Sequence, residues 1–224
     1  MRMEYSLVTL VGNRKIYSAP KFWNYIQKLN DPPARIFVSC TEETFKKFSK
    51  SYSGLIPLTW LHGNGDMGNS HILSTTAARE VIRKEVIKLP YDWTLWLDSD
   101  ILVPHDIIEK FEVLLEKNPK LIWVNGYHPA RQEGGDAGRT RHGLASSFIH
   151  RDLLEGVPFF SCTIRGMTTG DDYIWKDIAG CLARPFELTI LRGIYFDVGH
   201  ALKDGSIHEF TSEQRTKMDR EFKS

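Results

Sequence analysis

The sequence predicts an α/β fold, in which a mainly parallel central sheet is covered by helices on both faces. Short apolar runs alternate with helix-like segments from residue 5 to residue 127. This β-α-β-α order is typical of parallel strands that are joined by helical crossovers. One apolar run, WTLWLDSD at 93–100, ends in two aspartates that are separated by a single residue. Ligands of such sheets bind beyond the carboxyl ends of the strands, so the end of this run is the first candidate for a binding site.

Local sequence signals mark the ends of several expected helices in the first half. Asn30-Asp31-Pro32-Pro33 ends the first helix, Thr41 caps the second, and Pro104 begins the fourth. The expected strands are 6–12, 34–40, 55–61, 93–100 and 121–127. The expected helices are 19–30, the segment after Thr41, 70–88 and 104–117. The loops after strands one, two and four should meet at one crevice, namely Gly12–Arg14, Cys40–Glu43 and Asp98–Asp100.

The pattern changes after residue 127. Residues 128–143 are rich in glycine and charge and are typical of a mobile loop or lid that could close over a ligand. A strand is expected at 144–150, and a helix with acidic residues at its start is expected over 170–180. The segments 181–190 and 193–201 are expected to carry the later strands, and 202–224 is expected to be a polar C-terminal tail.

Composition excludes several classes of function. The formal net charge of +1 gives no electrostatic reason to expect binding to nucleic acid. No apolar run approaches the roughly 18 residues of a membrane span, so no transmembrane segment is expected. The chain has three cysteines without metal-ligand spacing, and this odd number argues against a disulfide framework. A reducing, cytoplasmic location is the simplest expectation.

The two aspartates at the end of the fourth strand predict a cation site. Side chains two residues apart on a strand share a face, so Asp98 and Asp100 should point the same way. Two close carboxylates repel unless positive charge lies nearby. Oxygen ligands of this kind suit Mg²⁺ or Mn²⁺, ions that proteins often share with substrate phosphates. The plainer alternative is a pair of solvated acids in a turn at the end of the strand.

These residues resemble those of a known family. The DSD that follows LWL, preceded by a helix with Ala77-Ala78-Arg79, resembles the nucleotide-diphospho-sugar transferases of the Rossmann-like GT-A fold. The pattern is nearest to family 2 glycosyltransferases and covers residues 5–127 and, more loosely, 144–201. Glu80 departs from it because an asparagine is usual there. SCTEE, at the end of the second strand, lacks the usual pair of aspartates.

The resemblance implies a single domain over residues 1–201. It would comprise a nucleotide-sugar-binding half, 1–127, and an acceptor half, 128–201, with a smaller acceptor-side sheet. Binding of the nucleotide sugar is implied for Gly12, Asn13, Arg14, Arg79, Asp98 and Ser99. Binding of Mn²⁺ or Mg²⁺ is implied for Asp98, Asp100 and the late histidine His200. Asp172 would be the general base, with Asp171 in place of the usual glutamate.

The function implied by the resemblance is metal-dependent transfer of a sugar from a nucleotide-diphosphate sugar to an acceptor hydroxyl. The general base at Asp172 favours inversion at the anomeric carbon. A sugar, a lipid-linked or a protein acceptor all remain open, as does a homodimer. Two alternatives remain, the first within the enzymes and the second from a different class. One is a sugar-1-phosphate nucleotidyltransferase, and the other is an inactive nucleotide-sugar-binding protein. Against the first, LVGNRK after the first strand has only one glycine, where that reaction favours a glycine-rich phosphate loop.

Overall fold

The computed structural model describes residues 3–63, 71–127, 144–164, 167–169 and 171–210. The α-helices are α1 (Ala19–Ile26), α2 (Glu42–Phe48), α3 (His71–Val86), α4 (Ile107–Lys117), α5 (Arg151–Gly156) and α6 (Asp171–Ala183). The 3-10 helices are η1 (Asn13–Ser18), η2 (Ser49–Ser51) and η4 (Arg184–Phe186). The strands are β1 (Tyr5–Leu10), β2 (Arg35–Cys40), β3 (Leu58–His62), β4 (Trp93–Asp98), β5 (Ile101–Leu102), β6 (Leu121–Tyr127), β7 (Ser146–His150), β8 (Cys162–Ile164), β9 (Met167–Thr169), β10 (Thr189–Tyr195), β11 (Gly199–Ala201) and β12 (Ile207–His208).

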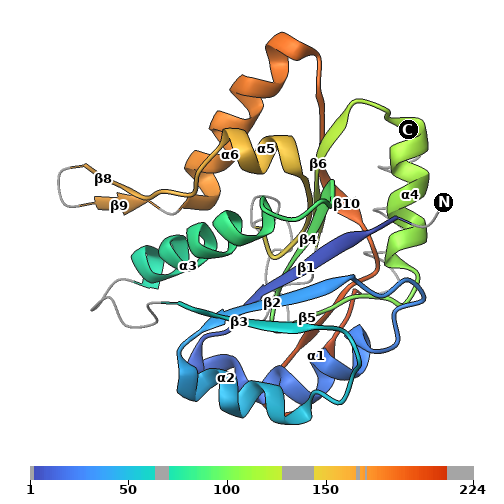
Figure 1. Ribbon diagram of the computed structural model, residues 1–224, viewed down its shortest axis with the longest axis vertical. Coiled ribbons are helices and arrows are strands. Elements are labelled where there is room, and N and C mark those ends of the chain that lie inside the picture. The colour runs from blue at the N-terminus through green and yellow to red at the C-terminus, as the bar shows by residue number, and fades with distance from the viewer. Residues whose placement is uncertain (1–2, 64–70, 128–143, 165–166, 170, 211–224) are drawn as a thin grey trace.

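A seven-stranded sheet with the order β10-β6-β7-β4-β1-β2-β3 forms the centre of the fold (Figure 1). Strand β1 is parallel to β2 and β4, β2 is parallel to β3, and β6 is parallel to β10. Strand β7 is antiparallel to both of its neighbours. The predicted mainly parallel sheet is therefore confirmed. Chain order runs from β1 through β2 to β3 on one side, while β4 lies on the other, so β1 and β4 flank a topological switch point.

Helices cover both faces of this sheet, as the sequence predicts. Successive residues of β1 point to opposite faces, so Leu7 joins one core cluster and Val8 joins the other. The Leu7 cluster includes buried side chains of α1, α2 and α4. The Val8 cluster includes those of α3, α5 and α6. The predicted core tryptophans Trp93, Trp96 and Trp123 are all buried.

Two small antiparallel sheets accompany the central one. Strand β5, which begins directly after Asp100, pairs with β11, and β11 also pairs with β12. Phe210, just past β12, is buried in the same core cluster as Leu7. The first residues of the predicted polar tail, 202–210, therefore include a strand and a core residue. Strands β8 and β9 form a separate hairpin.

Some expected boundaries were wrong. Residues 181–186 were expected to begin a strand, but they end α6 and form η4, and β10 starts only at Thr189. The helix continues because Trp175, Ala179 and Ala183, four residues apart, are all buried on one side of it. The expected mobile loop at 128–143 and most of the loop at 62–70 lie outside the described residues.

Candidate functional site

The candidate site lies where β1 and β4 end at the same edge of the sheet. The two strands run parallel, and Leu10, the last residue of β1, is the register partner of Asp98, the last residue of β4. The segment that follows β1 is η1, and the segment that follows β4 contains the second aspartate. Both connections therefore leave the sheet at its switch point, where a ligand crevice is expected.

The two aspartates share a partner, although not for the reason that the sequence suggested. Strand β4 ends at Asp98, and residues 99–100 form a turn before β5, so the alternation of side chains along a strand does not apply to them. The turn nevertheless brings both carboxylates to one ammonium group. Ser99, between them, is fully buried.

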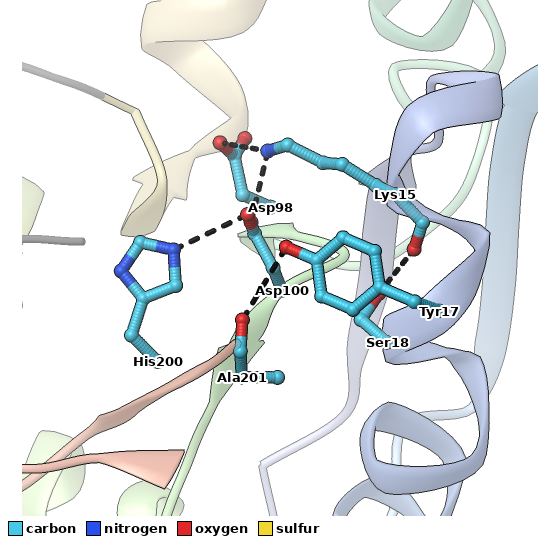
Figure 2. A network of polar contacts seen from close by, with 7 residues as sticks. All are labelled: Lys15, Tyr17, Ser18, Asp98, Asp100, His200 and Ala201. Atoms are coloured by element: carbon cyan, nitrogen blue, oxygen red, sulfur yellow. Dashed lines mark hydrogen bonds and ion pairs between the residues drawn. The ribbon is translucent and has the colours of Figure 1, made fainter. Parts of the chain in front are cut away.

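The shared partner is Lys15 of η1 (Figure 2). Its Nζ donates to Oδ1 of Asp100 at 2.8 Å and to Oδ2 of Asp98 at 3.0 Å. The Asp100 side chain has no exposed surface, whereas those of Lys15 and Asp98 are partly exposed. The ammonium thus lies at the position where the sequence predicted a cation.

The charges around Asp98 favour its ionised form. Burial raises the pKa of Asp98, as does the negative charge of Asp100. The positive charges of Lys15 and Arg79, with the hydrogen bond from Lys15, lower it by more, so the pKa of Asp98 lies below its ordinary value. Asp98 is therefore ionised at neutral pH, and the positive charges of Lys15 and Arg79 stabilise its carboxylate.

His200 lies beside the same pair. Strand β11 runs antiparallel to β5, and the backbone N–H of Ala201 donates to the carbonyl oxygen of Asp100 at 2.8 Å. This pairing places Nε2 of the buried His200 3.2 Å from Oδ2 of Asp100. The Tyr17 hydroxyl donates to the carbonyl oxygen of Ala201 at 3.4 Å, which links η1 to β11 (Figure 2).

The residues expected at the nucleotide lie on two sides of this pair. Gly12, Asn13 and Arg14 are exposed directly after β1. Arg79 lies on α3 and is buried, and its charge reaches Asp98. Contact of these residues with a nucleotide stays a prediction.

Glu80, the departure from the family pattern, has a structural role. Its carboxylate accepts hydrogen bonds from Nε and Nη2 of Arg83 at 2.7 and 2.8 Å and from the backbone N–H of Phe159 at 2.9 Å. Nη1 of Arg83 donates to the carbonyl oxygen of Leu154 at 2.7 Å. The pair therefore connects α3 to α5 and to the segment between α5 and β8.

The expected acidic pair of the acceptor half lies at the start of a helix. Helix α6 begins at Asp171, so Asp172 is in its first turn, as the sequence predicts. The side chains of both residues lie outside the described part of the structure. Trp175 was open to two interpretations, stacking on a sugar or packing beneath the helix. It is buried, stacks on Phe159 and donates from Nε1 to the carbonyl oxygen of Val157 at 3.0 Å.

The donor set of the site suits a divalent cation, but its present arrangement holds an ammonium group. Among the described residues, no three His, Cys, Asp or Glu side chains are grouped so that they could hold a metal ion. Asp98, Asp100 and His200 offer carboxylate oxygens and an imidazole nitrogen, which suit Mn²⁺ or Mg²⁺. The position between the carboxylates fits a cation, because Lys15 Nζ already lies within hydrogen-bond distance of both.

Sequence reasoning missed Lys15, although a signal for it was present. The expected loop after the first strand ended at Arg14, one residue earlier. Two carboxylates at the switch point require a cation, and Lys15 is the basic residue that follows Arg14 in the loop after the neighbouring strand. Its reach could not be derived from the sequence, because it depends on η1 folding back towards the end of β4.

Comparison with known proteins bears on the fold. No protein-family model matches the sequence, and no curated protein is similar to it at a significant level. Among solved structures, a mannosyltransferase from Pyrobaculum calidifontis, PcManGT, in complex with GDP-Man and Mn²⁺ matches with a TM-score of 0.56 at 13% identity, over 85% of this chain and 55% of that one. Glucosyl-3-phosphoglycerate synthase from Mycobacterium tuberculosis, in complex with Mg²⁺ and UDP, matches with a TM-score of 0.54 at 12% identity, over 97% and 76%.

A third match is residues 1–349 of TarS from S. aureus, with a TM-score of 0.52 at 13% identity, over 79% of this chain and 55% of that one. The chain thus spans about half the length of PcManGT and of this part of TarS. None of the helices in the described ranges is long and apolar enough to cross a membrane. With its seven-stranded, mainly parallel sheet and its small antiparallel sheets, the chain has a Rossmann-like GT-A fold.

Proposed function

We propose that the protein is a glycosyltransferase that moves a sugar from a nucleoside-diphosphate sugar to an acceptor hydroxyl. The observation that carries this proposal is the charged cluster at the switch point of a GT-A fold. Asp98, Asp100, Lys15 and His200 meet where the parallel strands β1 and β4 end. Ligands of open α/β sheets bind at such a point, and two of the similar structures hold nucleotides together with Mn²⁺ or Mg²⁺.

Each residue has a role that follows from its position. Gly12, Asn13 and Arg14 are exposed beside the site and would line the base and ribose of the donor. Arg79 and Lys15 would supply positive charge to the diphosphate. Asp98 and Asp100, with His200 beside them, would hold a divalent cation. When bound, this cation would offset the negative charge that develops on the departing diphosphate.

The residues that would act on the acceptor lie at the start of α6. Asp172 would take the proton of the acceptor hydroxyl while that oxygen attacks the anomeric carbon, a contribution of about 10²–10⁴-fold in rate. Attack from the face opposite the leaving group would invert the anomeric configuration. Asp171, at the first position of the helix, would interact favourably with the helix dipole.

The test is the release of nucleoside diphosphate from a panel of UDP- and GDP-sugars, with Mn²⁺ and with candidate sugar, lipid-linked or protein acceptors. We expect one donor to be turned over, and Asp172→Asn to lose transfer while it still binds the donor. Asp152→Asn is the matched control, because Asp152 is an exposed acid in the first turn of α5. Proton NMR of the product's anomeric centre reads the stereochemical outcome. Release of inorganic pyrophosphate from a nucleoside triphosphate and a sugar 1-phosphate would instead support a nucleotidyltransferase.

A further inference from the structure

We propose that Lys15 is a built-in counter-cation whose displacement couples metal binding to nucleotide binding. In the structure its ammonium lies between Asp98 and Asp100. When a nucleoside diphosphate and a divalent cation bind together, the ammonium leaves the carboxylates to the metal and donates to the diphosphate. This inference rests on the proposed glycosyl-transfer site. It adds that the metal ion and the nucleotide each raise the affinity of the site for the other.

The contacts of Lys15 support the first half of this proposal. Nζ lies 2.8 Å from Asp100 and 3.0 Å from Asp98, so it uses the carboxylate oxygens that a metal ion would need (Figure 2). Burial makes this competition strong, because the Asp100 side chain has no exposed surface and charge interactions are less screened there. A divalent cation that arrives alone must therefore displace the ammonium from both carboxylates.

The positive charges near Asp98 also support coupled binding of the metal ion and the nucleotide. Among the described residues, the positive charges of Lys15 and Arg79 both act on Asp98. These positive charges oppose the binding of a further cation at the two carboxylates. A diphosphate brings several negative charges and offers the lysine a new partner. The affinity of the site for the metal should then rise steeply in the presence of the nucleotide.

The backbone around Lys15 allows the side chain to move alone. The Lys15 N–H donates to the carbonyl oxygen of Gly12 at 2.8 Å, and the Ser18 hydroxyl donates to the carbonyl oxygen of Lys15 at 2.6 Å. Tyr17 holds η1 to β11 through Ala201. The four-carbon stem is partly exposed, so the ammonium can swing on this fixed base towards the exposed Gly12–Arg14 segment.

The experiment measures four affinities for each variant. Mn²⁺ binding is followed by the electron paramagnetic resonance of the free ion, with and without saturating UDP or GDP, and nucleotide binding is followed by calorimetry, with and without Mn²⁺. The variants are Lys15→Met, which removes the charge, and Lys15→Arg, which keeps it. Lys15→Gln replaces Lys15→Met if the latter does not fold. Lys46→Met is the control, because it makes the same charge change at an exposed pair on α2.

We expect Lys15→Met to bind Mn²⁺ alone about tenfold more tightly than the wild type. It should bind the nucleotide alone more weakly, and the factor by which each ligand tightens the other should shrink by about the same tenfold. Lys15→Arg and Lys46→Met should resemble the wild type in their Mn²⁺ affinity.

Two results would overturn the role of Lys15 without excluding glycosyl transfer, and the second would also remove the divalent cation from the proposed site. One is an unchanged affinity for Mn²⁺ alone in a Lys15→Met variant that still binds the nucleotide. The other is Mn²⁺ binding in no variant, together with loss of nucleotide binding in Lys15→Met, which would mean that the ammonium replaces the metal permanently. If no variant bound any nucleoside diphosphate, the proposed function itself would fail.

Discussion

Replacement of Glu80 by glutamine should destabilise the fold, because Glu80 joins α3 to the segment before β8. Its carboxylate accepts three hydrogen bonds, two from Arg83 and one from the backbone N–H of Phe159. Glutamine has the same shape but only one acceptor oxygen and no charge. Its amide nitrogen would face a donor, and the largely buried guanidinium of Arg83 would lose its counter-charge.

The magnitude follows from these contacts. A hydrogen bond to a charged group contributes about 1.5–3 kcal/mol to the free energy of unfolding, and breaking a buried pair costs about 3–5 kcal/mol. The side chains of Glu80 and Arg83 are 20% and 11% exposed, so water screens part of this interaction. We therefore expect Glu80→Gln to lower the free energy of unfolding by about 2 kcal/mol at neutral pH. This corresponds to a melting temperature that is lower by about 4–8 °C for a chain of this size.

The loss should depend on pH in a defined direction. Burial raises the pKa of Glu80, but the hydrogen bonds from Arg83 and Phe159 and the charges of Arg83 and Lys84 lower it by more, so it lies below 4.5. A carboxyl group whose pKa is depressed by folding stabilises the protein above its unfolded pKa and loses this contribution as the pH falls through the folded pKa. The difference between wild type and variant should thus be constant above about pH 5.5 and should shrink below pH 4.5.

Urea denaturation at several pH values, followed by circular dichroism, measures this difference. The matched control is Glu85→Gln on the same helix, because Glu85 forms a more exposed pair with Lys88 and should contribute less than about 1 kcal/mol. A double-mutant cycle with Arg83→Met isolates the pair. The reasoning is refuted if Glu80→Gln is as stable as Glu85→Gln, or if its loss is the same at pH 3.5 and pH 7.

Three further predictions concern the core. Burial raises the pKa of the Cys40 thiol to about 12. Iodoacetamide at pH 8 should therefore alkylate the other two cysteines rapidly and Cys40 only after unfolding, which mass spectrometry can measure. Rapid labelling of all three cysteines would contradict this. In Gly126→Ala the new Cβ would lie 2.8 Å from the carbonyl oxygen of Ser146. Urea denaturation should therefore show a free energy of unfolding that is lower by about 1–3 kcal/mol. An unchanged midpoint would argue against this close approach. In the same assay, Trp175→Phe should lower the free energy of unfolding by about 2 kcal/mol, because it leaves the Val157 carbonyl without its indole partner and opens a cavity. A variant as stable as the wild type would count against the packing described for Trp175.

Much of the fold could be predicted because its signals are local. The apolar runs that became β1, β2, β4 and β6 were each long enough to identify a strand, and Thr41 does cap α2 by accepting a hydrogen bond from the Thr44 N–H at 3.3 Å. Alternation of strands and helices then favoured a parallel sheet. The register of that sheet places the ends of β1 and β4 side by side, which is what the expected crevice required.

The rest depends on tertiary contacts. The two-residue strands β5 and β12 exist because they pair with β11, and nothing in their own sequence indicates a strand. Residues 181–183 are helical because Ala183 packs with Trp175 and Ala179 in the core. The partnership of Lys15 with Asp98 spans 83 residues of sequence, so it became visible only once η1 was placed.

The central claim is that the Asp98–Asp100 pair holds a divalent cation for a nucleoside diphosphate. The most direct measurement is a crystal structure with Mn²⁺ and UDP or GDP, read from the anomalous signal of manganese. We expect a peak within about 2.3 Å of a carboxylate oxygen of Asp100, with the diphosphate on its far side and Lys15 Nζ moved from the carboxylates to the phosphate oxygens. The account is contradicted if the nucleotide is bound elsewhere, or if it is bound here while the ammonium still lies between the two carboxylates.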